Sequence, residues 1–187
     1  MQRRHVTHAP LRKGNTLEKD FINIQSTDEF RTLRFGILGN VANNGCGGIA
    51  ARNMLLANGI DLSLNEVIKG LRLRLGTAFG LGLLGTNFFS LFAYMSKFLR
   101  MRLSLVIGLR RKVFSSCTAV IILYYWKHGK KLGAHFITGV RCDDGKFDFY
   151  NYRYSKYHAS IDELYTAFKK ESSIPIGIIG SLGKRGK

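Results

Sequence analysis

A cysteine flanked by glycines is the residue of this chain best placed to act as a nucleophile. The run Asn44-Gly45-Cys46-Gly47-Gly48 opens a stretch whose apolar residues recur at helical spacing, which predicts a helix over residues 46–58. The first turn of a helix carries partial positive charge and free N–H groups, and both favour a thiolate over a thiol. Small neighbours also let the main chain of a substrate approach. A small buried cysteine at a tight turn is the alternative interpretation.

A histidine and an asparagine on two predicted strands could complete such a site. A thiolate nucleophile works with a histidine base, and that base needs a third group to orient it. His135 and Asn151 lie in strands predicted over residues 134–141 and 146–152. If residues 143–145 form a three-residue hairpin loop, His135 and Asn151 become diagonal neighbours on one face of the sheet. Taken alone, a histidine such as His135 is more often a strand-end histidine bonded to the main chain.

An asparagine upstream of the cysteine could stabilise a developing oxyanion. Asn40 lies six residues before Cys46 and can donate its side-chain N–H₂, with the main-chain N–H of Cys46 as a second donor. Asn43 and Asn44 are nearer candidates for the same role. An asparagine that bonds its own loop is the alternative for any one of them.

These residues resemble the papain-like cysteine peptidases, and within that group the bacteriocin-processing peptidases of double-glycine leaders. The resemblance spans residues 40–182 and rests on Asn40, Gly45-Cys46-Gly47, Ala50-Ala51, Asn53-Met54, Gly59, Ala134-His135-Phe136 and Phe149-Tyr150-Asn151. It implies that Cys46, His135, Asn151 and Asn40 form the catalytic site. Two departures stand out. The family usually has Gln at the position of Asn40, and its leader peptidases usually have Asp at the position of Asn151, where papain itself has Asn.

The elements that would position these residues change type along the chain. Helices are predicted over residues 46–58, from 63 onward and over 87–99. Strands follow over 103–107, 119–125, 134–141, 146–152 and 174–182, with one further helix over 160–170. An earlier short strand is predicted over 21–24. Helices followed by an antiparallel sheet indicate an α+β fold. The resemblance implies the papain-like version, in which N-terminal helices pack on the sheet. The length suits a single domain, over residues 16–187, and the basic N-terminus predicts a mobile arm over residues 1–15.

The charge of the chain favours contact with anions. The formal net charge is +17, and no acidic residue occurs from Val67 to Cys142. Such a field suits nucleic acid, an anionic membrane surface or an acidic peptide, and also a merely solvated basic surface. The uncharged stretch 75–96 could span a bilayer by length, but its glycines predict a loop followed by a short helix. An odd cysteine count and an N-terminus without an apolar core point to the cytoplasm, with membrane association left open.

No metal or cofactor is predicted, because no Cys/His spacing fits a zinc site and no glycine pattern fits a nucleotide loop. The sequence therefore predicts a cysteine peptidase that cleaves a peptide or amide bond. An amidase or acyltransferase on the same residues remains an alternative. A second alternative is a non-catalytic basic protein that binds nucleic acid or an anionic membrane surface. For nucleic acid, residues 152–158 interleave aromatic and cationic side chains as a stacking platform would, although a solvated loop has the same composition.

Overall fold

The order of helices and strands follows the predicted change of type along the chain. A computed structural model describes residues 21–72, 85–105, 113–129, 131–153 and 155–186. The basic arm 1–15 and most of the glycine-rich segment 74–85 lie outside these residues. The helices are α1 (Asp28–Thr32), α2 (Val41–Asn44), α3 (Cys46–Ala57), α4 (Leu64–Arg72), α5 (Phe88–Met95) and α7 (Ile161–Lys170).

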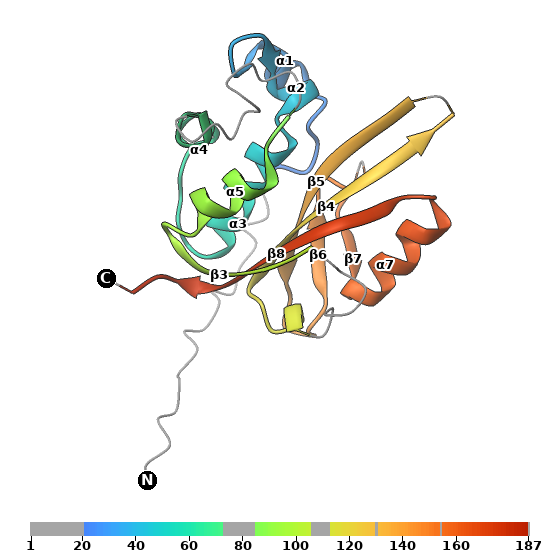
Figure 1. The fold of residues 1–187 in the computed structure, drawn as a ribbon. Coiled ribbons are helices and arrows are strands. Elements are labelled where there is room, and N and C mark those ends of the chain that lie inside the picture. The colour runs from blue at the N-terminus through green and yellow to red at the C-terminus, as the bar shows by residue number, and fades with distance from the viewer. Residues whose placement is uncertain (1–20, 73–84, 106–112, 130, 154, 187) are drawn as a thin grey trace.

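The strands form one small and one large antiparallel sheet. The small sheet pairs β1 (Arg34–Phe35) with β2 (Gly39–Asn40). The large sheet has six strands in the order β3-β8-β4-β5-β6-β7 (Figure 1). Its members are β3 (Leu99–Ser104), β4 (Ala119–His128), β5 (Lys131–Arg141), β6 (Phe147–Tyr150), β7 (Tyr157–Ala159) and β8 (Ile174–Lys184). The molecule is therefore an α+β protein, as predicted.

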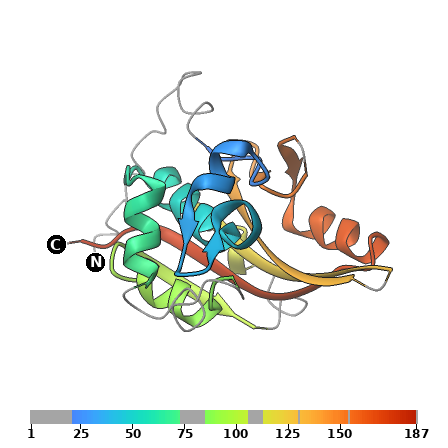
Figure 2. The same cartoon turned by 90° about the horizontal axis from the view of Figure 1, so that it is seen from above.

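Side chains alternate between the two faces of the large sheet, and each face has its own core. Ile121, Phe136 and Ile179 face α3, α4 and α5 in one apolar cluster. Their neighbours along the strands, among them Val120 and Ile178, join a second cluster with α7. Figures 1 and 2 show this arrangement, with α7 on the side of the sheet away from α3 and α5. A third cluster joins the segment of α1, β1 and α2 to the outer side of α3 and α4.

Helix α3 forms as its pattern predicts. It begins at Cys46, and Gly59, just beyond its C-cap Asn58, has a positive φ of 70° that only glycine adopts without cost. Ten of its residues are buried, so this helix is the central support of the α3-side core. The hydroxyl of Thr138 on β5 donates to the carbonyl of Ala50 at 3.1 Å and fixes the helix to the sheet.

The β5–β6 hairpin has the predicted register. Thr138 pairs with Tyr150, and Arg141 with Phe147. The main-chain N–H of Cys142 also donates to the carbonyl of Lys146, which closes the three-residue loop. The predicted capping box is present at α7, where Ser160 and Glu163 satisfy each other's N–H groups.

Several elements differ from the prediction. β4 and β5 are longer than predicted and reach His128 and Lys131 at the ends that meet. Residues 21–24 form no strand, because both main-chain groups of Ile22 bond the side-chain amide of Asn53 in α3 and leave no strand partner to satisfy. Helix α5 ends at Met95 rather than 99, and β3 begins at Leu99, so the predicted strand 103–107 starts too late. The end of that predicted strand, 106–107, lies outside the described residues. The short strands β1, β2 and β7 were missed since each has only two or three residues.

Candidate active site

Cys46 is the first residue of α3, as predicted, and it is nearly buried at 7% exposure. Its main-chain N–H belongs to the first turn, where helical N–H groups have no partner within the helix. Burial raises the pKa of the Cys46 thiol, while the main-chain N–H groups of Phe136, Gly47 and Cys46 itself oppose that rise. Burial is the larger effect, so the resting sulfur is a protonated thiol that requires a base.

The sulfur of Cys46 reaches the sheet beside the predicted base. The N–H of Phe136 that faces the sulfur belongs to the residue directly after His135. Pairing between β5 and β6 ends at Thr138 and Tyr150, so β5 has an edge free of β6 at His135 and Phe136. Phe136 points into the α3-side core, whereas His135 points toward Tyr124 on the other side. The N-terminus of α3 therefore meets β5 at its main-chain edge, between these two side chains.

The ring of His135 has a defined tautomer. Its Nε2 lies 2.6 Å from the main-chain carbonyl oxygen of Asn151. A carbonyl only accepts, so Nε2 carries the proton and Nδ1 of the neutral ring is left with a lone pair. Burial lowers the pKa of His135, and the bond to Asn151 opposes that effect. A neutral imidazole with its basic nitrogen at Nδ1 is the state a general base needs.

The structure brings His135 and Asn151 together, but not by the predicted contact. Asn151 follows the end of β6 with a positive φ of 59°, and this turn directs its main-chain carbonyl to the histidine. The side-chain amide, which was predicted to orient the ring, instead donates from Nδ2 to Oε1 of Gln25 at 3.3 Å. The prediction of a side-chain orienter is therefore corrected to a main-chain one, because β6 ends at Tyr150, before Asn151, rather than at residue 152.

Gln25 is a residue that the sequence analysis missed. Its Nε2 donates to the carbonyls of Val41 and Ala42, at 2.7 and 3.0 Å, and its Oε1 accepts from Asn151. The side-chain amide of Gln25 thus connects α2, which leads into the Cys46 helix, to Asn151, the residue that bonds His135. It comes from a segment without periodicity, so only the fold reveals it.

Asn40 is the N-cap of α2. Its Oδ1 accepts the main-chain N–H of Asn43 at 2.9 Å. The amide oxygen therefore caps α2, as the alternative interpretation of Asn40 expected. Only the amide nitrogen is left to donate to an oxyanion.

A buried hydroxyl group, that of Thr86, lies at the first turn of α3. The side chain of Thr86 packs so closely on Gly47 that any side chain at Gly47 would collide with it. Thr86 is 9% exposed, and its hydroxyl has no hydrogen-bond partner among the described residues. This buried donor next to Cys46 was not predicted, because no sequence pattern places residue 86 beside the first turn of α3.

Tyr124 packs against the base. It pairs directly with His135 across β4 and β5, and the two rings meet edge to face at 5.8 Å between centroids. Burial raises the pKa of Tyr124, and charges on Tyr152, Glu171 and Cys46 add to that rise. The ring also packs in a tilted arrangement against Phe168 of α7, with 4.6 Å between centroids. Tyr124 therefore covers one side of the His135 ring, which is only partly exposed.

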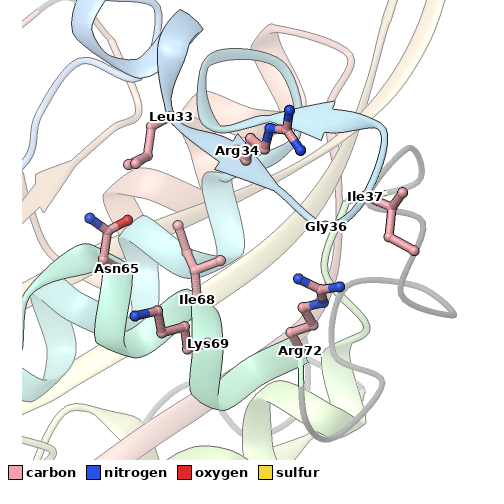
Figure 3. A pocket seen from close by; sticks show the side chains of 8 residues that line it. All are labelled: Leu33, Arg34, Gly36, Ile37, Asn65, Ile68, Lys69 and Arg72. Carbon is pink, nitrogen blue, oxygen red and sulfur yellow. The ribbon is translucent and has the colours of Figure 1, made fainter.

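A basic hollow lies beside the segment that leads to Cys46. Figure 3 shows the side chains of Arg34, Lys69 and Arg72 around it, with Ile68 in its wall. Ile68 is also the closest neighbour of Gly48 in the first turn of α3. An anionic group held in this hollow would lie one side-chain layer from the helix that bears Cys46.

The aromatic run 152–158 is folded on itself. The guanidinium of Arg153 lies over the rings of Tyr152 and Tyr157, at 5.1 and 4.9 Å from their centroids, and pairs with Glu171. Tyr152 also packs against the α7-side core. Two of the faces that a base would need for stacking are thus already used, which weakens the nucleic-acid alternative.

Comparison with known proteins does not assign this chain to a family: no family model matches it, and no curated protein does either. Among the described residues, no helix has both the length and the apolar character needed to cross a bilayer. The uncharged stretch 75–96 contributes only the short helix α5 to that part of the chain.

Proposed function

We propose that this protein is a papain-like cysteine hydrolase that cleaves a peptide or amide bond, with Cys46 as nucleophile and His135 as base. The observation that carries the proposal is the bond from Nε2 of His135 to the carbonyl of Asn151. It leaves Nδ1 as the basic nitrogen of a neutral ring on the strand that the first turn of α3 meets. A strand-end histidine bonded to the main chain would make the same contact, so the proposal also needs the Cys46 sulfur to meet the N–H of Phe136, the residue next to His135.

The directions of both pKa values fit a general-base mechanism. Burial raises the pKa of the Cys46 thiol and lowers that of the His135 imidazole, so both groups rest uncharged. Nδ1 of His135 takes the thiol proton as the sulfur attacks the substrate carbonyl carbon. The oxyanion accepts the main-chain N–H of Cys46, with the Asn40 amide or the Thr86 hydroxyl as second donor. The imidazolium returns its proton to the leaving amine, and water then hydrolyses the thioester.

The basic hollow supports a substrate with an anionic group. Arg34, Lys69 and Arg72 line it, and Glu66, the acidic residue nearest to them in α4, is occupied by the Ser63 main chain and hydroxyl. An acidic side chain or a carboxylate would therefore meet a net positive surface. An amine acceptor in place of water would make the same site an acyltransferase, so the nature of the acceptor separates these activities.

A thiol-directed activity probe tests the proposal. The probe should label the wild type and Cys142→Ser equally, since Cys142 lies outside the site, and should fail to label Cys46→Ala. His135→Ala should label at least about 100-fold more slowly, because general-base catalysis is worth about that much or more. Labelling that persists in folded Cys46→Ala, or that is unchanged in His135→Ala, would overturn the assignment.

A further inference from the structure

A cysteine, a histidine and an aspartate that the proposed reaction does not use meet at the far end of the β5–β6 hairpin. Cys142 follows β5, Asp148 lies in β6 and His158 lies in β7. One potential ligand atom from each residue lies within 4.8 Å of the other two. No sequence pattern predicts this group, because its residues come from separate segments and match no zinc-binding spacing.

The atoms are close to the arrangement that a tetrahedral metal ion imposes. Sγ of Cys142 is 4.0 Å from Nδ1 of His158, and Nδ1 is 2.7 Å from Oδ1 of Asp148. Zinc bonds of about 2.0 Å to nitrogen and oxygen and about 2.3 Å to sulfur place such ligand atoms about 3.3–3.6 Å apart. Shifts below about 1 Å would therefore bring all three atoms to bonding distance, with a fourth position open to water.

A fourth residue, Asp144, bonds the other ring nitrogen of His158. Nε2 of His158 lies 2.9 Å from Oδ2 of Asp144 in the hairpin loop. Histidine ligands of metals characteristically donate their second ring N–H to a carboxylate, which fixes the ring orientation and strengthens the ligand nitrogen. The pair leaves Nδ1 directed at Cys142 and Asp148, which is the geometry of a supported metal ligand.

One contact opposes metal binding. Nζ of Lys156 lies 3.0 Å from Oδ2 of Asp148 and adds positive charge beside the cluster. It engages the carboxylate oxygen that is not turned toward His158, so Oδ1 remains available. The ammonium should weaken the site without abolishing it.

We propose that Cys142, Asp148 and His158 bind one transition-metal ion of the zinc class, with Asp144 as a positioning residue. A thiolate, an imidazole and a carboxylate together form a borderline-soft ligand set that suits Zn²⁺ rather than Mg²⁺ or Ca²⁺. The ion replaces the thiol proton of Cys142 and the proton that Nδ1 shares with Asp148, and both protons leave to solvent. Because the ligands come from β5, β6 and β7, the ion joins the short edge strand β7 to its neighbours.

Cobalt(II) titration of the full reduced chain tests the site. A thiolate-to-cobalt charge-transfer band should appear at one equivalent in the wild type and in Cys46→Ala, the control that retains Cys142. Cys142→Ser should lose the band. Asp144→Asn should weaken Zn²⁺ binding about 10- to 100-fold in calorimetry, as loss of an orienting carboxylate does elsewhere. Lys156→Gln should tighten it.

The outcomes separate this site from the proposed active site. Loss of the band in Cys46→Ala with its retention in Cys142→Ser would place the metal at the catalytic cysteine and overturn the proposal. No band, or Zn²⁺ affinity equal in the wild type, Cys142→Ser and His158→Gln, would also overturn it. Because a variant could fold poorly, each is first compared with the wild type by circular dichroism without metal, and Lys156→Gln provides a readout that a merely structural cluster would not move.

Discussion

Replacement of Asn151 distinguishes a main-chain orienter of His135 from a side-chain one. Both Asn151→Gly and Asn151→Ala remove the amide that donates to Gln25, so both lose one buried hydrogen bond, at a cost of about 1–3 kcal/mol. They differ in the turn itself. At a φ of 59° alanine is strained by about 1–2 kcal/mol, whereas glycine is not. The carbonyl that holds Nε2 should therefore keep its place in the glycine variant.

This difference sets the size of the expected effect. If the strain in Asn151→Ala turns the carbonyl away from His135, about 1–2 kcal/mol corresponds to at most about 5- to 30-fold in kcat/KM. Asn151→Gly should therefore retain more activity than Asn151→Ala. Asn151→Asp should be worse than glycine, because its carboxylate would face Oε1 of Gln25, whose nitrogen already donates to two carbonyls.

The assay is kcat/KM on a peptide substrate, with the free energy of unfolding measured in urea for each variant. Under the side-chain hypothesis, Asn151→Asp would preserve activity, and the glycine and alanine variants would be equally impaired. That order of activities in folded proteins would refute the main-chain assignment.

Four further outcomes are expected. Gly47→Ala should lower the free energy of unfolding by about 1–3 kcal/mol through its collision with Thr86, whereas Gly48→Ala meets only ordinary contacts, from 3.4 Å, and should be neutral or stabilising. Burial lowers the pKa of His135 below its usual 6.5, so its contribution to the free energy of unfolding is complete above pH 6.5 and is lost as the pH falls. The free energy of unfolding in urea should therefore fall more steeply with acid in the wild type than in His135→Gln. Tyr124→Ala should expose His135, raise its pKa and move the acid limb of kcat/KM to higher pH, while Tyr124→Phe should not. High salt should raise the KM of an acidic peptide and leave turnover of a neutral small substrate nearly unchanged.

Each of these has a contrary result. Equal stability of Gly47→Ala and Gly48→Ala would mean that Thr86 does not fill the space that a side chain at Gly47 would occupy. Parallel pH curves for the wild type and His135→Gln would mean that His135 is not buried in its neutral form. An acid limb that stays in place in Tyr124→Ala would deny the shielding role. A steep salt effect on the neutral substrate would mean that the basic charge acts at the reacting centre.

The main elements of the fold could be predicted from the sequence because their signals are local. The glycine at residue 59 and the capping box at Ser160 and Glu163 mark helix ends, and the loop 143–145 fixes the register of its hairpin. The segment 21–24 could not be interpreted in this way. Its main chain is satisfied by the side chain of Asn53, a contact that no pattern in either segment announces.

The positions of Cys46 and His135 on their elements could be predicted from the sequence, but their contacts could not. Cys46 and His135 carry chemical type and a position on an element, and the fold puts the sulfur at the residue next to the histidine. The bond that orients His135 depends on the φ of Asn151, which propensity cannot supply because asparagine tolerates both signs. Gln25 and Tyr124 act through long-range packing, so only the three-dimensional structure shows them.

The position of β8 has a consequence for the order in which the protein becomes complete during synthesis. This strand lies between β3 and β4, yet it leaves the ribosome after every other described element. Until then β3 has no partner in the large sheet, and β4 lacks the neighbour that pairs with it from Ala119 to Tyr125. Pairing of segments so distant along the chain must wait for the later one. A nascent chain that already contains Cys46 and His135 therefore still lacks the strand between β3 and β4, and the large sheet is complete only after residue 184 has been made.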